Sequence, residues 1–236
     1  MNNKINNLAQ KPKLKSQSSD TKAEPESKLS LFINALTAVV DSKIEVLVLQ
    51  HPQEKREELA TVAILKKCLP KTVVKVGLSW PNLKKILDRE VDPNHWAVIY
   101  LGTQAESSKM LETKTPVFLS GKAKKLSDLE GIVVLDGSWR EAKTLWWRNA
   151  WLLKLNRIVL NPLKPAIYNA LRKEPRRESV STLEAVAMVL AEIEKRPEIY
   201  DLLTTPLKNF IATVGIQRPR RNHGPKRDWR RRKRTS

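Results

Sequence analysis

The sequence predicts an α/β protein with a mostly parallel sheet that carries helices on both faces. Short apolar runs rich in β-branched residues alternate along the chain with segments whose apolar side chains recur every three or four residues. The run at 131–135 is continuously apolar, which is typical of a strand buried on both faces. With 236 residues, the chain is long enough for one or two domains with a substantial core.

The expected elements alternate in chain order after a short helix near residue 29. The expected strands cover residues 45–50, 72–78, 96–101, 116–119, 131–135 and 157–160, because each is a short apolar run. The expected helices cover residues 54–69, 81–89, 138–155, 182–195 and 198–213. Pro52 suits the first turn of a helix, and Leu59, Val62, Leu65 and Leu69 then form an apolar stripe.

Positive charge is concentrated towards the C-terminus. The chain has 44 Lys and Arg residues against 25 Asp and Glu, a formal net charge of +19. Ten of the basic residues and one acid lie in residues 217–236, while residues 1–30 are polar with little apolar periodicity. We therefore expect a disordered arm (1–30), a globular domain (31–216) and a basic tail (217–236). This charge favours nucleic acid as the partner over a membrane, because no apolar run is long enough to span a bilayer.

Cysteine content and the N-terminal segment bear on the cellular compartment. Cys68 is the only cysteine, so the chain can form neither an internal disulfide nor a cysteine zinc site. The N-terminal segment has no apolar stretch of the kind found in secretory signals. Both observations fit a reducing environment, and we expect a cytoplasmic protein.

Two of the expected helices begin with the same S-x-x-E spacing. Ser138 and Glu141 follow the turn Asp136-Gly137, and Ser181 and Glu184 precede the helix expected at 182–195. Helix capping alone accounts for this spacing. A ligand with an ammonium and a carboxylate group would also suit two such helix starts.

Aromatic and basic residues near these junctions are candidates for RNA contacts. Trp139, Trp146, Trp147 and Trp151 fall on the helix expected at 138–155, and we expect most of them in the core. Trp139, beside the turn, is the candidate to stack on a base or on adenine. His51 is either a turn histidine or a substrate contact. In the loop before Ser181, residues Arg172, Lys173, Arg176 and Arg177 either stay solvated or bind RNA phosphates.

Four motifs in this order resemble those of the DTW-domain proteins, which are tRNA-uridine aminocarboxypropyltransferases. The motifs are QHPQE at 50–54, LDGSW at 135–139, LRKEP at 171–175 and STLEA at 181–185. The resemblance covers about residues 44–196. Ser138 replaces the usual Thr of the D-x-T-W motif and keeps the hydroxyl. Many family members also carry a cysteine cluster before the first strand, and this chain has none there, so no metal is expected.

The resemblance implies a fold, a reaction and a set of site residues. The fold would be SPOUT-like, with a C-terminal trefoil knot. The reaction would transfer the 3-amino-3-carboxypropyl group of S-adenosylmethionine to N3 of a uridine in tRNA and release methylthioadenosine. The residues that would bind this co-substrate are Leu101, Gly102, Asp136, Ser138, Trp139, Ser181, Thr182 and Glu184. The expected RNA contacts are His51, Arg172, Lys173, Arg176, Arg230 and Arg231.

Asp136 is the candidate general base of that reaction, since the N3–H of uridine must lose its proton as N3 attacks carbon. Glu184 would orient the ammonium or ribose of the co-substrate. Three alternatives remain open: the same reaction on ribosomal RNA, a methyltransferase of the same broad fold, and a non-catalytic RNA-binding or ribosome-assembly factor. The sequence leaves the oligomeric state open.

Overall fold

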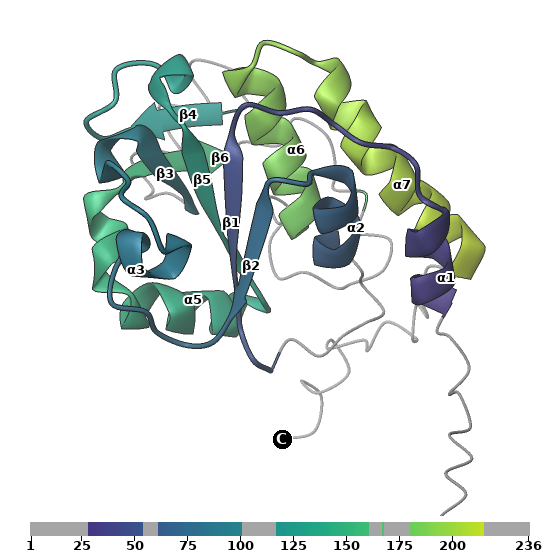
Figure 1. Ribbon diagram of the computed structural model, residues 1–236, viewed down its shortest axis with the longest axis horizontal. Coiled ribbons are helices and arrows are strands. Elements are labelled where there is room, and N and C mark those ends of the chain that lie inside the picture. The colour runs from purple at the N-terminus through teal and green to yellow at the C-terminus, as the bar shows by residue number, and fades with distance from the viewer. Residues whose placement is uncertain (1–27, 54–60, 101–116, 161–166, 168–179, 215–236) are drawn as a thin grey trace, which may run out of the picture.

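The computed structural model describes residues 28–53, 61–100, 117–160, 167 and 180–214. These residues form one six-stranded sheet with helices packed against both faces (Figure 1), which confirms the predicted α/β architecture. The strands are β1 (Glu45–Gln50), β2 (Thr72–Val76), β3 (Trp96–Tyr100), β4 (Val117–Ser120), β5 (Gly131–Asp136) and β6 (Asn156–Leu160).

The sheet has the strand order β2-β1-β5-β3-β6-β4. Neighbouring strands run parallel except β4, which pairs antiparallel with β6 at the margin of the sheet. The five parallel strands therefore end on one side, which we call the carboxyl end of the sheet, opposite its amino end. Asp136, the last residue of β5, pairs in register with Gln50, the last residue of β1. In open parallel sheets, ligand sites lie outside this end.

Two helical layers cover the sheet. One layer contains α2 (Thr61–Cys68), α6 (Thr182–Ile193) and α7 (Glu198–Val214), with α1 (Lys28–Ala35) against its outer side. The other contains α3 (Leu83–Leu87), α5 (Trp139–Arg148) and the 3-10 helix η4 (Ala150–Lys154). Two shorter 3-10 helices, η2 (Pro93–His95) and η3 (Leu126–Asp128), precede β3 and β5.

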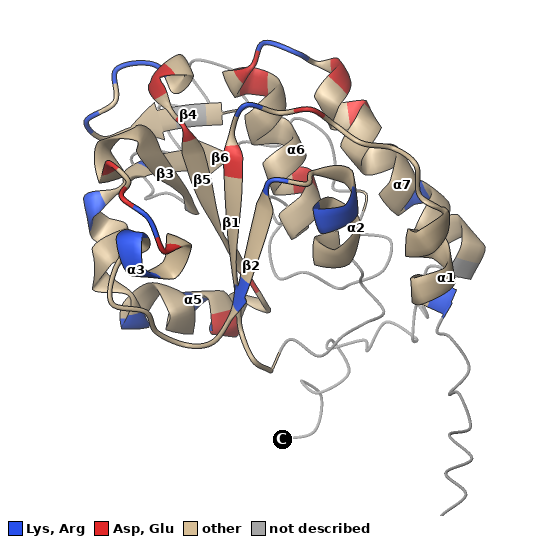
Figure 2. Cartoon of the chain, in the orientation of Figure 1, with Lys and Arg blue, Asp and Glu red and all other residues tan. Residues whose placement is uncertain are grey.

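Alternation along β1 divides the core into two clusters. Val46 and Val48 pack with α2, α6 and α7, whereas Leu47 and Leu49 pack with α3, α5 and η4. All four side chains are at most 1% exposed, as expected for a strand covered on both faces. The inner parts of β1 and β5 carry no charged residue (Figure 2). The continuous apolar runs seen in the sequence are therefore explained by burial on both sides.

The prediction of one continuous helix over residues 138–155 is wrong, because the helix is interrupted at Asn149. Asn149 is fully buried and leaves the helical conformation, with φ −124° and ψ 70°. Its amide nitrogen donates to the carbonyls of Leu78 and Leu145, and its amide oxygen accepts from the Trp80 backbone and the Trp151 indole. An Asn side chain that bonds backbone groups in this way competes with the helix, so α5 ends and η4 begins.

Other boundaries differ by a few residues from those expected. The helix expected at 81–89 is limited to α3, because Asn82 caps its start through the Lys85 N–H and Asp88 adopts a left-handed conformation. The helix near residue 29 is confirmed as α1. The first part of the helix expected at 54–69 lies outside the described residues, as do residues 1–27 of the arm and the basic tail.

The SPOUT-like fold and its knot stay predictions. Most of the chain between β6 and α6 (residues 161–166 and 168–179) lies outside the described residues.

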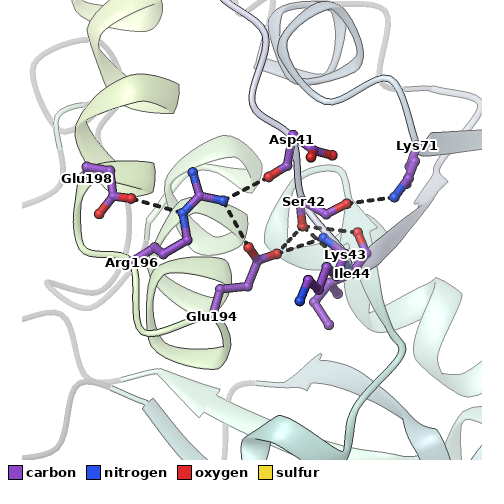
Figure 3. Close-up of polar contacts among 8 residues, drawn as sticks. All are labelled: Asp41, Ser42, Lys43, Ile44, Lys71, Glu194, Arg196 and Glu198. Carbon is purple, nitrogen blue, oxygen red and sulfur yellow. Dashed lines mark hydrogen bonds and ion pairs between the residues drawn. The ribbon is translucent and has the colours of Figure 1, made fainter.

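A polar network joins α6, α7 and the segment before β1 at the amino end of the sheet (Figure 3). Ser42 Oγ and the Lys43 backbone N–H donate to Glu194 Oε1 at 2.5 and 3.0 Å. Arg196 Nη1 donates to the Asp41 carbonyl at 2.9 Å and to Glu194 Oε2 at 3.3 Å. These bonds fix the turn after α6 to the segment that precedes β1.

Candidate active site

The candidate site lies at the carboxyl end of the sheet and centres on Asp136. Its side chain is 6% exposed, and its two carboxylate oxygens accept from different elements. Gln50 Nε2, at the end of β1, donates to Oδ2 at 2.8 Å, and Thr182 Oγ1, at the start of α6, donates to Oδ1 at 2.6 Å. The carboxylate is therefore held in one orientation by β1 and α6, and three of the sequence motifs meet at this residue.

The turn after Asp136 requires glycine. Gly137 has φ +153°, in the region that side chains disfavour, and an added Cβ would lie 2.9 Å from the Glu141 Cβ. The same Cβ would lie 3.4 Å from the Cβ of His51. The His51 backbone N–H donates to the Asp136 carbonyl at 3.0 Å, which continues the pairing of β1 and β5 beyond the strands. The positive φ and the close approach of Glu141 therefore explain why this position requires glycine.

Helix α5 begins with the capping box that its spacing predicts. The Ser138 backbone N–H donates to Glu141 Oε2 at 2.6 Å. His51 is 7% exposed, and its Nδ1 accepts the Gln53 N–H at 3.2 Å while lying 3.8 Å from Glu141 Oε1. Because Nδ1 acts as an acceptor, the neutral ring carries its proton on Nε2. His51 is thus a largely enclosed residue beside the turn, and its contact with RNA stays a prediction.

Helix α6 begins with the second predicted capping box. Ser181 Oγ accepts the Glu184 N–H at 3.2 Å and donates to Glu184 Oε2 at 2.9 Å. The Ser181 backbone N–H donates to that oxygen at 3.2 Å, and the Ile167 N–H donates to Oε1 at 2.6 Å. Glu184 is 1% exposed, so its carboxylate is enclosed by the chain itself. In this geometry it fixes the start of α6, and its contact with a ligand stays a prediction.

The buried charge of Glu184 affects a neighbouring phenol on α7. Burial raises the pKa of Tyr200, and the negative charges of Glu184 and Asp201 raise this pKa further. Tyr200 therefore stays neutral over the physiological pH range. The phenol of Tyr200 therefore adds no negative charge to that of Glu184.

The structure brings together six of the predicted site residues at the carboxyl end, in the turn after β5 and at the start of α6. They are Asp136, Ser138, Trp139, Ser181, Thr182 and Glu184. The predicted contacts Leu101, Gly102, Arg172, Lys173, Arg176, Arg230 and Arg231 lie outside the described residues. Sequence reasoning missed the role of Gln50, although a polar residue that ends the strand beside β5 was a usable signal.

The tryptophans are less buried than expected. Trp151 is 8% exposed and packs in the core, and Trp146 is partly buried against the same cluster. Trp147 is 73% exposed and Trp139 is 36% exposed, so two of the four tryptophans, rather than most of them, pack against the core. Trp151 belongs to η4, and the break at Asn149 separates it from the face of α5 that carries Trp147.

The described residues contain neither a metal-binding cluster nor a membrane-spanning helix. Within the described ranges, no group of three His, Cys, Asp or Glu side chains is arranged to hold a metal ion. No helix in that part of the chain is both long and apolar enough to cross a membrane.

The sequence is similar to those of curated proteins from several organisms. The chain is similar to "tRNA-uridine aminocarboxypropyltransferase 2" of Macaca fascicularis, with 27% identity over 172 residues, covering 70% of this chain and 53% of the relative. It is also similar to the protein of that name from Drosophila melanogaster, with 27% identity over 167 residues, covering 69% of this chain and 61% of the relative. The chain thus spans a little over half the length of these curated relatives. No solved structure matches it significantly.

A family model, described as the DTW domain, matches residues 28–215. The match includes every strand of the sheet, both helical layers and both capping boxes. Because it covers well over half of the chain, this protein belongs to the DTW domain family.

Proposed function

We propose that this protein transfers the 3-amino-3-carboxypropyl group of S-adenosylmethionine to N3 of a uridine in tRNA. Family membership and the names of the relatives support the reaction class and the tRNA substrate. One structural observation carries the assignment of the site. The Asp136 carboxylate, at the end of a central strand, is held by Gln50 and Thr182 beside the starts of α5 and α6.

The proposed step exchanges one bond for another. The N3 nitrogen of uridine forms a bond to the γ-carbon of the aminocarboxypropyl group while the bond from that carbon to sulfur breaks. When bound, the co-substrate supplies a sulfonium centre, whose sulfur takes the electron pair and leaves in methylthioadenosine. The proton on N3 passes to a carboxylate oxygen of Asp136, so charge and atoms balance. Much of the rate would come from aligning nitrogen, carbon and sulfur.

The arrangement of Asp136 suits the role of general base. A carboxylate oxygen accepts more than one hydrogen bond, so the bonds from Gln50 and Thr182 are compatible with a further bond from N3–H. Both partners are uncharged donors that fix the direction of the carboxylate. Gln50 and Thr182 are therefore positioning residues, and Asp136 is the residue that takes the proton.

The donor groups at this end of the sheet also fit the amino acid part of the co-substrate. The N-terminal turns of α5 and α6 bring backbone N–H groups and a positive helix dipole, which suit a ligand carboxylate. Glu184, in the first turn of α6, would orient the ammonium group or the ribose of the co-substrate. Trp139, which is partly exposed beside the turn, would form a wall of the pocket or stack on adenine.

Product analysis tests the proposal. Purified protein is incubated with tRNA and S-adenosylmethionine, and the nucleosides and small products are quantified by mass spectrometry. We expect aminocarboxypropyl-uridine together with an equal amount of methylthioadenosine. Release of S-adenosylhomocysteine would instead indicate methyl transfer and refute the proposal.

Variants of Asp136 then test the site. Asp136→Asn keeps the volume of the side chain but removes the base, and we expect turnover to fall roughly 10²- to 10⁴-fold. Glu194→Gln, at the other end of α6, is the matched control and should leave turnover unchanged. Normal turnover of Asp136→Asn at saturating co-substrate would exclude Asp136 as the base.

The basic tail belongs to the same proposal. Residues 217–236, which include Arg230 and Arg231, would add RNA affinity through phosphate contacts. Deleting the tail should weaken binding of tRNA and flatten the dependence of affinity on salt. An unchanged salt dependence would assign the tail no part in RNA binding. We also propose a cytoplasmic location, in keeping with the single, buried Cys68.

A further inference from the structure

The outward face of α5 carries a band of tryptophan and basic side chains. Residues four apart on a helix form rows along its surface. One row contains Trp139, Lys143 and Trp147, and the adjacent row contains Arg140, Thr144 and Arg148. Trp147 is 73% exposed and Trp139 is 36% exposed, and the three basic residues are also exposed. We call these two rows the α5 outer face.

The core does not require the tryptophans of this face. On the inward side of α5, Leu145 is fully buried and Trp146 packs against the cluster formed with α3 and η4. Trp147 points away from that cluster and contributes little to it. Trp139 and Trp147 are separated by eight residues, or about 12 Å along the helix axis. The helix therefore presents two indole groups along one line, with basic residues between and beside them in its sequence.

We propose that a single-stranded segment of the substrate RNA lies along the α5 outer face. One base would stack on Trp147, and the phosphates would contact Arg140, Lys143 and Arg148. Because Trp139 follows Asp136 by three residues, a strand on this face leads directly to the proposed base. The nucleotides beside the target uridine would then bind along the helix, outside the pocket. This inference rests on the proposed function, since it takes RNA to be the substrate.

Charge favours RNA over a protein as the occupant. The one carboxylate within α5, that of Glu141, is half-buried and accepts the Ser138 N–H, so it does not lie on the outer face. The face therefore combines aromatic and cationic groups on a chain of net charge +19. Protein interfaces also favour Trp and Arg, but they are depleted of Lys, whereas Lys143 lies between the two tryptophans of this face. Aromatic groups for bases and cations for phosphates are the pair of features that single-stranded RNA requires.

Binding of the full-length protein to a fluorescent single-stranded oligouridine and to a tRNA transcript tests the aromatic part. We expect Trp147→Ala to bind about tenfold more weakly, and Trp147→Phe to keep most of the affinity because it still offers a ring. Leu202→Ala is the matched control, since Leu202 is an exposed apolar residue on α7 in the other layer. Unchanged affinity of Trp147→Ala for both RNAs would overturn the inference.

The salt dependence tests the cationic part. Lys143→Gln removes one proposed phosphate contact and should lower the slope of log affinity against log salt by about one. Lys66→Gln, an exposed residue of α2 in the opposite layer, should leave this slope unchanged. If Trp147→Ala instead abolishes self-association in sedimentation and leaves RNA affinity intact, the face binds protein and the inference is wrong.

Failure of this inference is distinguishable from failure of the proposed function. If methylthioadenosine is released with none of the RNAs tested but Trp147→Ala still weakens RNA binding, the proposed function is wrong. The assignment of the α5 outer face as an RNA-binding surface is then retained. If transfer occurs and Trp147→Ala leaves both the affinity and the KM for tRNA unchanged, the surface fails alone.

Discussion

The two ends of α6 hold carboxylates in two different ways. At its start, Glu184 is 1% exposed, and Thr182 joins the helix to Asp136, which is 6% exposed. Beyond its other end, Glu194 lies in a network with Ser42 and Arg196, and the Arg196 side chain is 41% exposed. One helix thus connects an enclosed polar centre at the carboxyl end of the sheet to a more hydrated network at the amino end.

This difference separates function from anchoring. Burying carboxylates is costly, and a protein keeps them buried only where their hydrogen bonds are made or where the charge is used. At the amino end, the carboxylate of Glu194 and the guanidinium of Arg196 fix the chain before β1 to the turn after α6. The Glu194 side chain is 9% exposed, and water reaches this network mainly at Arg196. We therefore expect changes at the carboxyl end to affect turnover, and changes at the amino end to affect stability alone.

Among variants that compare the two ends of α6, the largest expected effect on turnover concerns two hydroxyl groups that each donate to a carboxylate. Thr182 Oγ1 lies 2.6 Å from Asp136 Oδ1, and Ser42 Oγ lies 2.5 Å from Glu194 Oε1. Thr182→Val should lower turnover roughly 10- to 100-fold, because a charge-assisted hydrogen bond that orients the base is lost. Ser42→Ala should keep normal turnover while lowering the free energy of unfolding. Steady-state kinetics with denaturant titrations check both, and equal turnover in the two variants would contradict the comparison.

A second comparison replaces a carboxylate at each end of α6 by an amide. Glu184→Gln replaces one acceptor oxygen with an NH₂ group, which faces a backbone N–H in a buried site, and should cost about 2 kcal/mol of stability. Glu194→Gln should cost about 1 kcal/mol, because one of its partners, the Arg196 side chain, is 41% exposed and can bond to water instead. Urea unfolding gives both values. A larger loss for Glu194→Gln would show that the network at the amino end is the more important of the two for stability.

A third comparison uses two glycines with positive φ. Gly137 has φ +153° at the carboxyl end, and Gly121, next to Asn156 at the amino end, has φ +140°. Alanine at either position should destabilise the protein by roughly 1–3 kcal/mol, because of backbone strain and close contacts. Only Gly137→Ala should also lower turnover in the folded protein, since it displaces the turn between Asp136 and α5. Thermal unfolding and kinetics below the melting temperature separate the two effects.

The smallest expected effect is a pH dependence at the amino end. The hydrogen bond from Arg196 holds the pKa of Glu198 below its ordinary value of 4.5. A carboxylate with a depressed pKa stabilises the fold above the pKa of the unfolded state, and this contribution is lost as pH falls through the folded value. Glu198→Gln should therefore be less stable than the parent protein at pH 6 and closer to it at pH 3. A difference that does not shrink towards acid would contradict this account.

Much of the fold was predictable because its signals are local. The apolar runs at β1 and β5 are continuous because both faces of the sheet are covered, and their positions were predicted within one residue. The two S-x-x-E capping boxes were predicted from spacing alone, since a cap involves residues only three apart. The interruption of α5 was not predictable, because Asn149 acts through Leu78 and Trp80, about 70 residues earlier in the chain.

By itself, the sequence determined the succession of strands and helices along the chain, the capped starts of α5 and α6, and the acidic residue that ends β5. Only the tertiary structure decided that Gln50 and Thr182 both bond to Asp136, and that Trp147 lies on the surface. The physical reason is the distance along the chain between the interacting residues. Apolar periodicity and caps depend on neighbours within one turn or one strand, whereas the orientation of a carboxylate depends on strand order and on the helix that packs beside it.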